Sequence, residues 1–233
     1  MKHKNKKNLS EKCLLEANQY FFSCLGISKW EPKTKKIKVL GVNWEIEDTV
    51  NFNVSLADMF SSNRLDADFW QPKYLDAFKI LQNKGEYKQL SQIAVIRKGS
   101  QARPDENLNF GIHYASIKDC DDLEISTSEF TDAKRPVTVS TGELVIAITG
   151  ATIGKSAINN TSVPIAICGD LAAIESNEVP PYYLLTVLSS EFIQQLSKRY
   201  TTGATNGHLA VRDVAKFPIP IFGKKDMEGF QKR

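Results

Sequence analysis

Apolar residues recur at two different periods along the chain, helical at the N-terminus and strand-like across the middle. Leu14, Ala17, Phe21 and Leu25 are three or four residues apart, which predicts one apolar stripe on a helix over Leu9–Leu25. A helix with such a stripe packs against its own domain or against a partner helix. We therefore expect the stripe to be a docking surface, with Leu14, Phe21 and Leu25 as its contact residues.

From Tyr87 onward, short apolar runs alternate with turns that contain Gly and Pro. This pattern indicates a mixed or largely antiparallel sheet within an α+β fold. Phe217–Phe222 is expected to be an edge strand, because its two prolines cannot donate to a ladder. The other predicted strands are Gln92–Arg97, Phe110–Ile117, Pro136–Val139, Leu144–Ile148, Lys155–Ile158, Pro164–Cys168 and Leu171–Ile174.

The remaining segments predict helices and connections. A single long helix is expected over Pro181–Tyr200, with six apolar residues on one face. Ser28–Lys38 contains Pro and Lys and is expected to be a linker, followed by a strand or an extended docking segment over Lys38–Asn53. Short helices are expected over Lys73–Gln82 and Leu209–Lys216, and the last eleven residues resemble the first turns of another helix.

Charge is unevenly distributed along the 233 residues. Residues 1–38 hold ten lysines and three acidic residues, a net charge of +7, whereas the rest carries 20 basic and 24 acidic residues, a net charge of −4. The basic arm is either a solvated tail or a nucleic-acid contact. Because the body is not basic, a nucleic-acid site there must be a local patch.

Two classes of protein are excluded by composition. No apolar run approaches the roughly 20 residues of a membrane span, and no signal peptide follows the basic start, so a cytoplasmic protein without membrane contact is expected. Cys13, Cys24, Cys120 and Cys168 show no CxxC spacing, which argues against a disulfide framework or a zinc site. We expect reduced thiols and no metal.

The segment Gly142–Ser156 resembles a phosphate-binding loop but differs from it by one residue. A Walker loop has four residues between its first glycine and its Gly-Lys pair, whereas only three separate Gly150 from Gly154, and Thr149 occupies the required glycine position. The residues that follow predict strand, turn and strand, where a phosphate loop would open a helix. We therefore expect a glycine-rich hairpin and no ATP or GTP site.

Two further enzyme patterns are weak. Val179-Pro180-Pro181-Tyr182 resembles an adenine methyltransferase motif but has Val179 where an Asn or Asp must accept the amino group, so it is better interpreted as a helix start. Pro104-Asp105 with Asp132-Ala133-Lys134 formally matches a metal-dependent nuclease, yet both halves lie beside prolines in predicted loops. Solvated loop charge is the favoured interpretation, and no catalytic residue is assigned.

Three polar loops suit DNA. Residues 97–103 offer Arg and Gln, which can bind base edges, and Lys and Ser, which suit phosphates. Residues 201–208 are small hydrogen-bonding residues that allow close backbone approach, and residues 149–155 add two threonines and a lysine. The candidate DNA contacts are Arg97, Lys98, Ser100, Gln101, Arg103, Thr149, Thr152, Lys155, Thr201, Thr202, Thr205, Asn206 and His208.

These segments, taken in order, resemble the specificity subunit of Type I restriction–modification systems. The motifs that carry the resemblance over about 160 residues are RLDADFWQPKY (64–74), YASIKD (114–119), GELVIAITGATIGKSAI (142–158), PPYYLLTVLSS (180–190), TTGATNGHL (201–209) and FPIPI (217–221). The resemblance implies a target recognition domain with a mixed, largely antiparallel twisted sheet. It divides the chain into a basic arm and helix (1–27), a linker and lead-in (28–86), the recognition domain (87–222) and the start of a truncated spacer helix (223–233).

The resemblance also implies function and partners. Such a subunit is not an enzyme; it binds double-stranded DNA and directs a methyltransferase (M) subunit and a restriction and translocation (R) subunit to their site. S-adenosylmethionine, ATP and Mg are then expected only on those partners, and none on this chain. A full specificity subunit has two recognition domains, so a single domain could pair with a second half-subunit. Two alternatives stay open: a stand-alone nuclease or methyltransferase, and a methyltransferase-docking remnant that no longer binds DNA.

Overall fold

The computed structural model describes residues 27–31, 36–39, 42–45, 54–62, 64, 67–71, 74, 86–121, 123–203 and 206–230. The predicted helix over residues 9–25 and its docking residues lie outside this part of the chain. An antiparallel sheet comes first, formed by β1 (Ile27–Glu31), β2 (Lys36–Val39) and β3 (Val42–Glu45). The prediction that residues 28–38 are a linker is therefore wrong. The two strands there are short and interrupted by lysines, so they lack the apolar run that marks a strand in a sequence.

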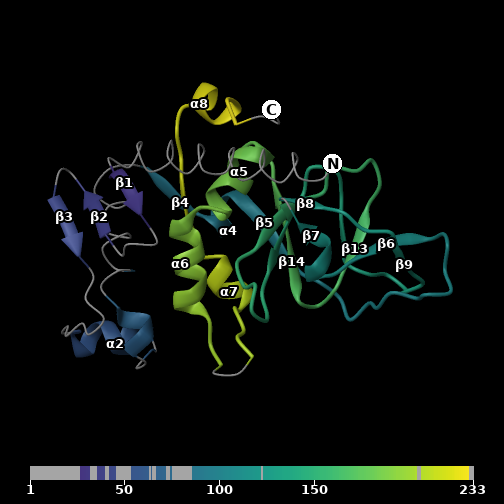
Figure 1. Cartoon of the computed structure of the whole chain (residues 1–233), viewed down its shortest axis with the longest axis horizontal. Helices are drawn as coiled ribbons and strands as arrows, with labels where there is room; N and C mark the ends of the chain where they lie inside the picture. The colour runs from purple at the N-terminus through teal and green to yellow at the C-terminus, as the bar shows by residue number, and fades with distance from the viewer. Residues whose placement is uncertain are drawn as a thin grey trace.

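The described strands after Glu86 form two larger sheets and a two-stranded ribbon (Figure 1). The six-stranded sheet has the order β5 (Ala94–Lys98), β14 (Leu171–Ser176), β11 (Leu144–Ala147), β12 (Ser156–Ile158), β8 (Glu124–Ile125) and β7 (Cys120–Asp121). The four-stranded sheet has the order β10 (Thr138–Val139), β13 (Ile165–Ile167), β6 (Ile112–Ala115) and β9 (Glu129–Thr131). All pairings are antiparallel except β12 with β8 and β13 with β6. The mixed, largely antiparallel α+β fold predicted from the sequence is confirmed.

Helices and the ribbon complete the described chain. The ribbon pairs β15 (Pro218–Pro220) with β4 (Tyr87–Gln89), and this confirms the edge strand predicted from the prolines. The helices are α2 (Leu56–Ser62), α4 (Leu90–Ile93), α5 (Pro181–Leu188), α6 (Glu191–Tyr200), α7 (Val211–Val214) and α8 (Lys224–Glu228), with short 3₁₀ helices η1 (Ala67–Trp70) and η2 (Ile117–Asp119). No helix in the described ranges has the length and apolar character needed to cross a bilayer.

The helix predicted over residues 181–200 is divided into two. The break falls at Ser189 and Ser190, and the Ser190 hydroxyl accepts a hydrogen bond from the Ile193 amide at the start of α6. Serine favours helix N-caps because its hydroxyl can satisfy an amide that has no intrahelical partner. The apolar period continues across this break, which explains why periodicity alone predicted one helix.

The six-stranded sheet separates two hydrophobic cores. On β11, Leu144 and Ile146 belong to the core beneath α5 and α6, whereas Val145 and Ala147 belong to the core shared with the four-stranded sheet. Figure 1 shows these helices on one side of β5 and β14 and strands β13, β6 and β9 on the other. Successive strand residues point to opposite faces, so a strand buried on both faces has a continuous apolar sequence. Burial on both faces therefore explains why β11 is apolar at every position before the glycine-rich turn.

The lead-in segment is attached to α6 through Arg199. This buried side chain donates from Nε to the Phe69 carbonyl oxygen at 2.8 Å, and its guanidinium lies 4.1 Å from the Phe69 ring centroid. Burial lowers the pKa of Arg199 from its usual value. A guanidinium over an aromatic face is attracted by the ring quadrupole. These contacts therefore fix the position of η1 against α6.

Truncation of Ile146 tests the contribution of β11 to the core beneath α5 and α6. We expect Ile146→Ala to lower the free energy of unfolding by about 2–5 kcal/mol, because the side chain is fully buried and leaves a cavity. Val95→Ala on β5 is the control, because that side chain is 59% exposed, and its expected cost is about 0.5 kcal/mol or less. Urea denaturation measures both variants, and equal losses would contradict this description of the core.

Candidate nucleic-acid interface

The glycine-rich segment after β11 is a hairpin turn, as predicted. The chain passes through Gly150 and Gly154, which have φ of +77° and +90°, and returns as β12 antiparallel to β11. A side chain on Gly154 would meet Ser197 of α6 at 2.9 Å, and the Gly154 carbonyl accepts from Gln194 Nε2 at 2.8 Å. Glycine suits this position because the turn has a positive φ and leaves no room for a side chain against α6. No helix opens at the loop, so the geometry of a phosphate loop is absent here.

Two of the predicted DNA loops are hydrogen-bonded to each other. The Gly150 amide donates to the Gly207 carbonyl at 3.1 Å, and Thr149 forms an isolated bridge with His208. His208 also exchanges both backbone hydrogen bonds with Thr202, at 2.9 and 2.7 Å. Residues 149–155 therefore form one continuous surface with residues 201–203 and 206–208, although about 50 residues separate the two segments in the sequence.

The third loop reaches this surface through the turn between β13 and β14. Ser100 forms an isolated β-bridge with Cys168. Gly169 lies close to Gln101, because a Cβ atom on Gly169 would be 3.0 Å from Gln101 Nε2. On the other side, the Thr149 hydroxyl donates to Asp170 Oδ1 at 2.7 Å. We call the surface formed by residues 97–103, 149–155, 169–170, 201–203 and 206–208 the polar rim. The sequence interpretation missed the 169–170 turn, although a Gly-Asp pair between two predicted strands was a signal for it.

Several predicted contact residues are already engaged within the protein. Arg97 pairs with Glu143 at 2.6 Å and with Glu175 at 3.4 Å, and Lys155 Nζ lies 2.5 Å from Asp121 Oδ1. The Ser100 hydroxyl hydrogen-bonds to backbone groups of residues 137 and 167. These side chains hold the rim together, so a DNA phosphate would have to compete with a carboxylate for Arg97 or Lys155.

The threonines of the rim are also held, and other predicted contacts are available. Thr201 donates from its hydroxyl to the Ser197 carbonyl at 2.7 Å, and Thr202 donates to the His208 carbonyl at 3.2 Å. The remaining described candidates are exposed, and their side chains make no hydrogen bond or ion pair in the described part of the chain; they are Lys98, Gln101, Arg103, Thr152, Asn206 and His208. Thr205, Leu14, Phe21 and Leu25 lie outside the described residues, so their roles stay predictions.

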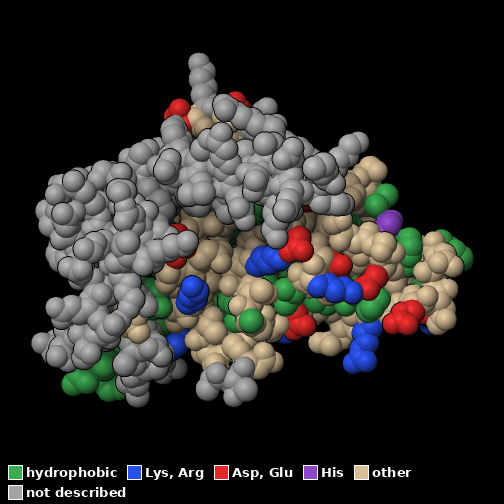
Figure 2. Space-filling model, in the orientation of Figure 1, with side chains coloured by type: hydrophobic (Ala, Val, Ile, Leu, Met, Phe, Trp, Pro, Cys, Tyr) green, Lys and Arg blue, Asp and Glu red, His purple; other side chains and the backbone are tan. Residues whose placement is uncertain are grey.

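The described surface carries charges of both signs. On the face shown in Figure 2, Lys and Arg side chains alternate with Asp and Glu side chains over the described part of the domain. Such a mixed surface produces no large field of one sign. On this face, any attraction of DNA by the described domain would therefore depend on individually placed groups.

Neither enzyme pattern forms a catalytic site in the described residues. Val179 is buried, and Pro181 begins α5, as the interpretation of a helix start predicted. Asp105 and Asp132 do line one pocket, but Asp105 Oδ1 accepts from the amide and the side chain of Asn107. Among the described residues, no group of three or more His, Cys, Asp or Glu side chains is placed to hold a metal ion.

No family model and no curated protein matches the sequence. Among solved structures, a chain from the type I R-M system matches with a TM-score of 0.50 at 16% identity, over 75% of this chain and 46% of that one. The HsdS subunit from Thermoanaerobacter tengcongensis matches with a TM-score of 0.49 at 18% identity, over 62% and 35%. The type IIG restriction endonuclease BpuSI matches with a TM-score of 0.47 at 11% identity, over 75% and 30%.

The protein therefore spans less than half the length of each of these solved chains. The match at a TM-score of 0.50 supports the fold assignment. It agrees with the mixed α+β fold described above. The domain has the fold of a chain from a type I restriction–modification system, which confirms the fold that the sequence motifs implied.

The Arg97 pairs predict a structural role for that residue. Glu143 is only 13% exposed, so Arg97→Ala would leave a largely buried carboxylate without its cation. We expect a loss of about 1–2 kcal/mol in the free energy of unfolding. Lys98→Ala, which removes the adjacent exposed cation, should leave stability unchanged. Thermal denaturation of both variants measures the difference, and equal midpoints would refute the structural role.

Cys120, beneath the Lys155–Asp121 pair, is predicted to be unreactive. Burial raises the pKa of its thiol to about 12, although the Lys155 ammonium acts in the opposite direction. The thiolate is the reactive form, so its fraction at pH 8.5 is very small while the protein is folded. We expect iodoacetamide to label the Cys120 peptide slowly in native protein and rapidly in urea, as read by mass spectrometry. Equal rates in the two conditions would contradict the burial.

Proposed function

We propose that this chain binds double-stranded DNA sequence-selectively, as the specificity component of a Type I restriction–modification complex. In this proposal it directs a methyltransferase subunit, and through the complex a restriction and translocation subunit, to their site. The chain itself is not an enzyme and holds no cofactor. It acts in the cytoplasm, and it pairs with a second specificity half-subunit to read two half-sites.

The observation that carries the proposal is the meeting of three loops at the polar rim. Each loop is predicted from its own residues as a DNA contact. Backbone contacts join two of the loops at Gly150 and Gly207, and the 169–170 turn lies between the third loop and Thr149. Glycines and threonines have small side chains, which would allow backbone groups of the rim to approach a ligand closely. The fold shared with a chain of a type I R-M system is consistent with this role.

Within the rim, we assign different roles to held and available residues. Arg97, Ser100 and Thr149 maintain the loops through intramolecular contacts. Lys98 and Arg103 are exposed cations without a side-chain partner among the described residues, and so they suit phosphates or guanine edges. Gln101, between them in sequence, offers an amide that can bind adenine bidentately.

Selection from random duplexes tests the proposal. The full chain, alone and with its cognate methyltransferase, is incubated with a randomised duplex library, and bound DNA is sequenced. We expect enrichment of one short base motif and weaker binding at higher salt, because phosphate contacts release counterions. Absence of any enriched motif would overturn the specificity claim.

The same experiment separates the alternatives. A chain that assembles with the methyltransferase but enriches no motif is the docking remnant. Cleavage or methylation of DNA by the purified chain alone identifies a stand-alone enzyme. Either outcome replaces the proposed function.

Removing the two available cations should weaken binding without loss of stability. For the double variant Lys98→Ala/Arg103→Ala, we expect lower affinity for all duplexes and a salt dependence of log K smaller by about 2. The matched control is Lys88→Ala/Lys224→Ala, which removes two exposed cations from the ribbon and α8. Filter binding across a salt series measures both. Equal salt slopes in the two variants would remove Lys98 and Arg103 from the interface.

A further inference from the structure

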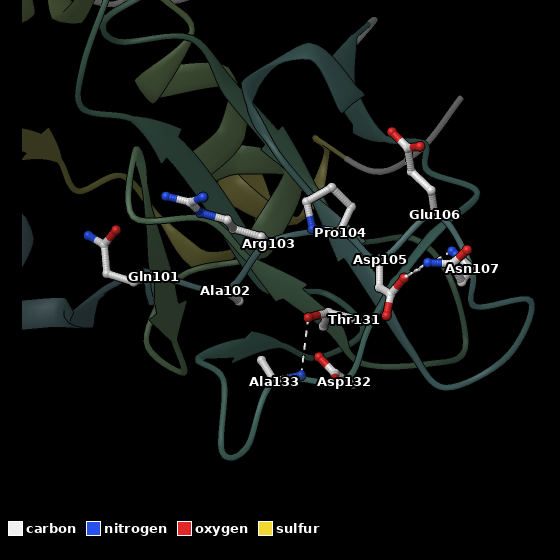
Figure 3. Close-up of a pocket in the computed structure, with 10 residues that line it drawn as sticks. All are labelled: Gln101, Ala102, Arg103, Pro104, Asp105, Glu106, Asn107, Thr131, Asp132 and Ala133. Carbon is white, nitrogen blue, oxygen red and sulfur yellow. Dashed lines mark hydrogen bonds between the residues drawn. The ribbon is translucent and has the colours of Figure 1, made fainter.

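A pocket of about 620 Å³ lies next to the polar rim (Figure 3). One wall is the segment 101–107 after β5, and the other is the end of β9 with residues 131–133. The Asp105 amide donates to the Phe130 carbonyl at 2.9 Å and joins the two walls. Gln101 belongs both to the rim and to the pocket, so the pocket continues the surface proposed to bind DNA.

The lining of this pocket does not suit a phosphate. It contains three carboxylates, from Asp105, Glu106 and Asp132, and one guanidinium, from Arg103. Anions repel a phosphate, whereas carboxylates are acceptors for N–H donors. The major groove of B-DNA presents such donors as the amino groups of cytosine N4 and adenine N6. The acid-rich lining therefore fits base edges better than the DNA backbone.

The Asp132 carboxylate is available to accept a new hydrogen bond. It is exposed, and its carboxylate has no hydrogen bond or ion pair in the described part of the chain. The loop that carries it is fixed where the Ala133 amide donates to the Thr131 hydroxyl at 3.2 Å, drawn as a dashed line in Figure 3. Asp105, in contrast, is occupied by Asn107.

Cations stand at the edge of the pocket. Lys134 and Arg135 follow the lining residue Ala133 directly and are exposed, and Arg103 lies on the opposite wall. Protein–DNA interfaces commonly combine cations that contact phosphates with other groups that contact base edges. This pocket offers both kinds of group, because acceptors line it and cations flank it.

We infer that this pocket is a base-reading subsite, in which Asp132 accepts a hydrogen bond from the amino group of a cytosine or an adenine. Arg103, Lys134 and Arg135 contact the adjoining phosphates. The inference rests on the proposed function and adds to it the class of base that the pocket selects. In this inference, the carboxylates of the nuclease-like pattern, Asp105 and Asp132, are hydrogen-bond acceptors and not metal ligands.

Base selection by Asp132 variants tests the inference. Random-duplex selection is repeated with the full chain carrying Asp132→Asn or Asp132→Ala, together with the methyltransferase. We expect a change of about tenfold in base preference at one position of the motif, because one hydrogen bond to a base edge is lost or altered. Where the wild type selects cytosine, asparagine should shift that position toward adenine, which it binds bidentately, and alanine should abolish the preference for either base. The salt slope should stay that of the wild type.

Two controls separate this outcome from general weakening. Glu86→Gln removes one exposed carboxylate near the ribbon and should leave the motif unchanged. Lys134→Ala/Arg135→Ala should weaken binding to all sequences and reduce the salt slope by about 2, with the same motif.

Three outcomes would overturn the inference. If the wild type enriches a motif and both Asp132 variants enrich the same motif, the subsite fails while the proposed function stands. If the wild type enriches no motif, the proposed function itself fails. If the chain cleaves duplex DNA with Mg²⁺ and Asp132→Asn abolishes cleavage without altering the motif, the carboxylate serves a nuclease.

Discussion

The burial of β11 and β14 on both faces is the constraint on which the rest of the structure depends. The two strands pair in antiparallel register, with Ala147 opposite Leu171, while β5 pairs with β14 so that Lys98 lies opposite Ala172. The end of β11, the start of β14 and the end of β5 therefore lie side by side along one edge of the sheet, the edge formed by the strand ends. Because both faces are filled by the two cores, the polar residues that follow these strands can only emerge at that edge.

This arrangement explains how loops distant in sequence become one surface. Residues 97–103 and 149–155 leave the sheet at the same edge, and the 169–170 turn lies between them. The fourth segment arrives by another route, because α6 ends at Tyr200 and the chain is then fixed by the Leu209 amide donating to the Ile148 carbonyl at 2.8 Å. Because these contacts fix the backbone of the rim, a ligand that bound there would cause a smaller loss of conformational entropy.

The sequence predicted the main strands and the polar loops well, because apolar runs and Gly-containing turns report burial and reversal directly. It failed where local pattern and tertiary context diverge. The Ser190 cap divided an apolar period that looked continuous, and β1 and β2 lack the apolar run that would mark them. Which polar residues are held could not be predicted either. The partners of Arg97 and Lys155 lie between 34 and 78 residues away, and no local rule connects them.

The resemblance to a phosphate loop has a packing origin. Gly154 is required because α6 presses against the turn at Ser197, and Lys155 follows it with its ammonium directed to Asp121. A nucleotide-binding loop uses the same two residue types to surround a phosphate with backbone amides. Here Gly154 and Lys155 instead join a hairpin to a helix and to β7. Lys155 can therefore contact a DNA phosphate only by exchanging one anion for another, so its contribution to binding is the difference between two ion pairs.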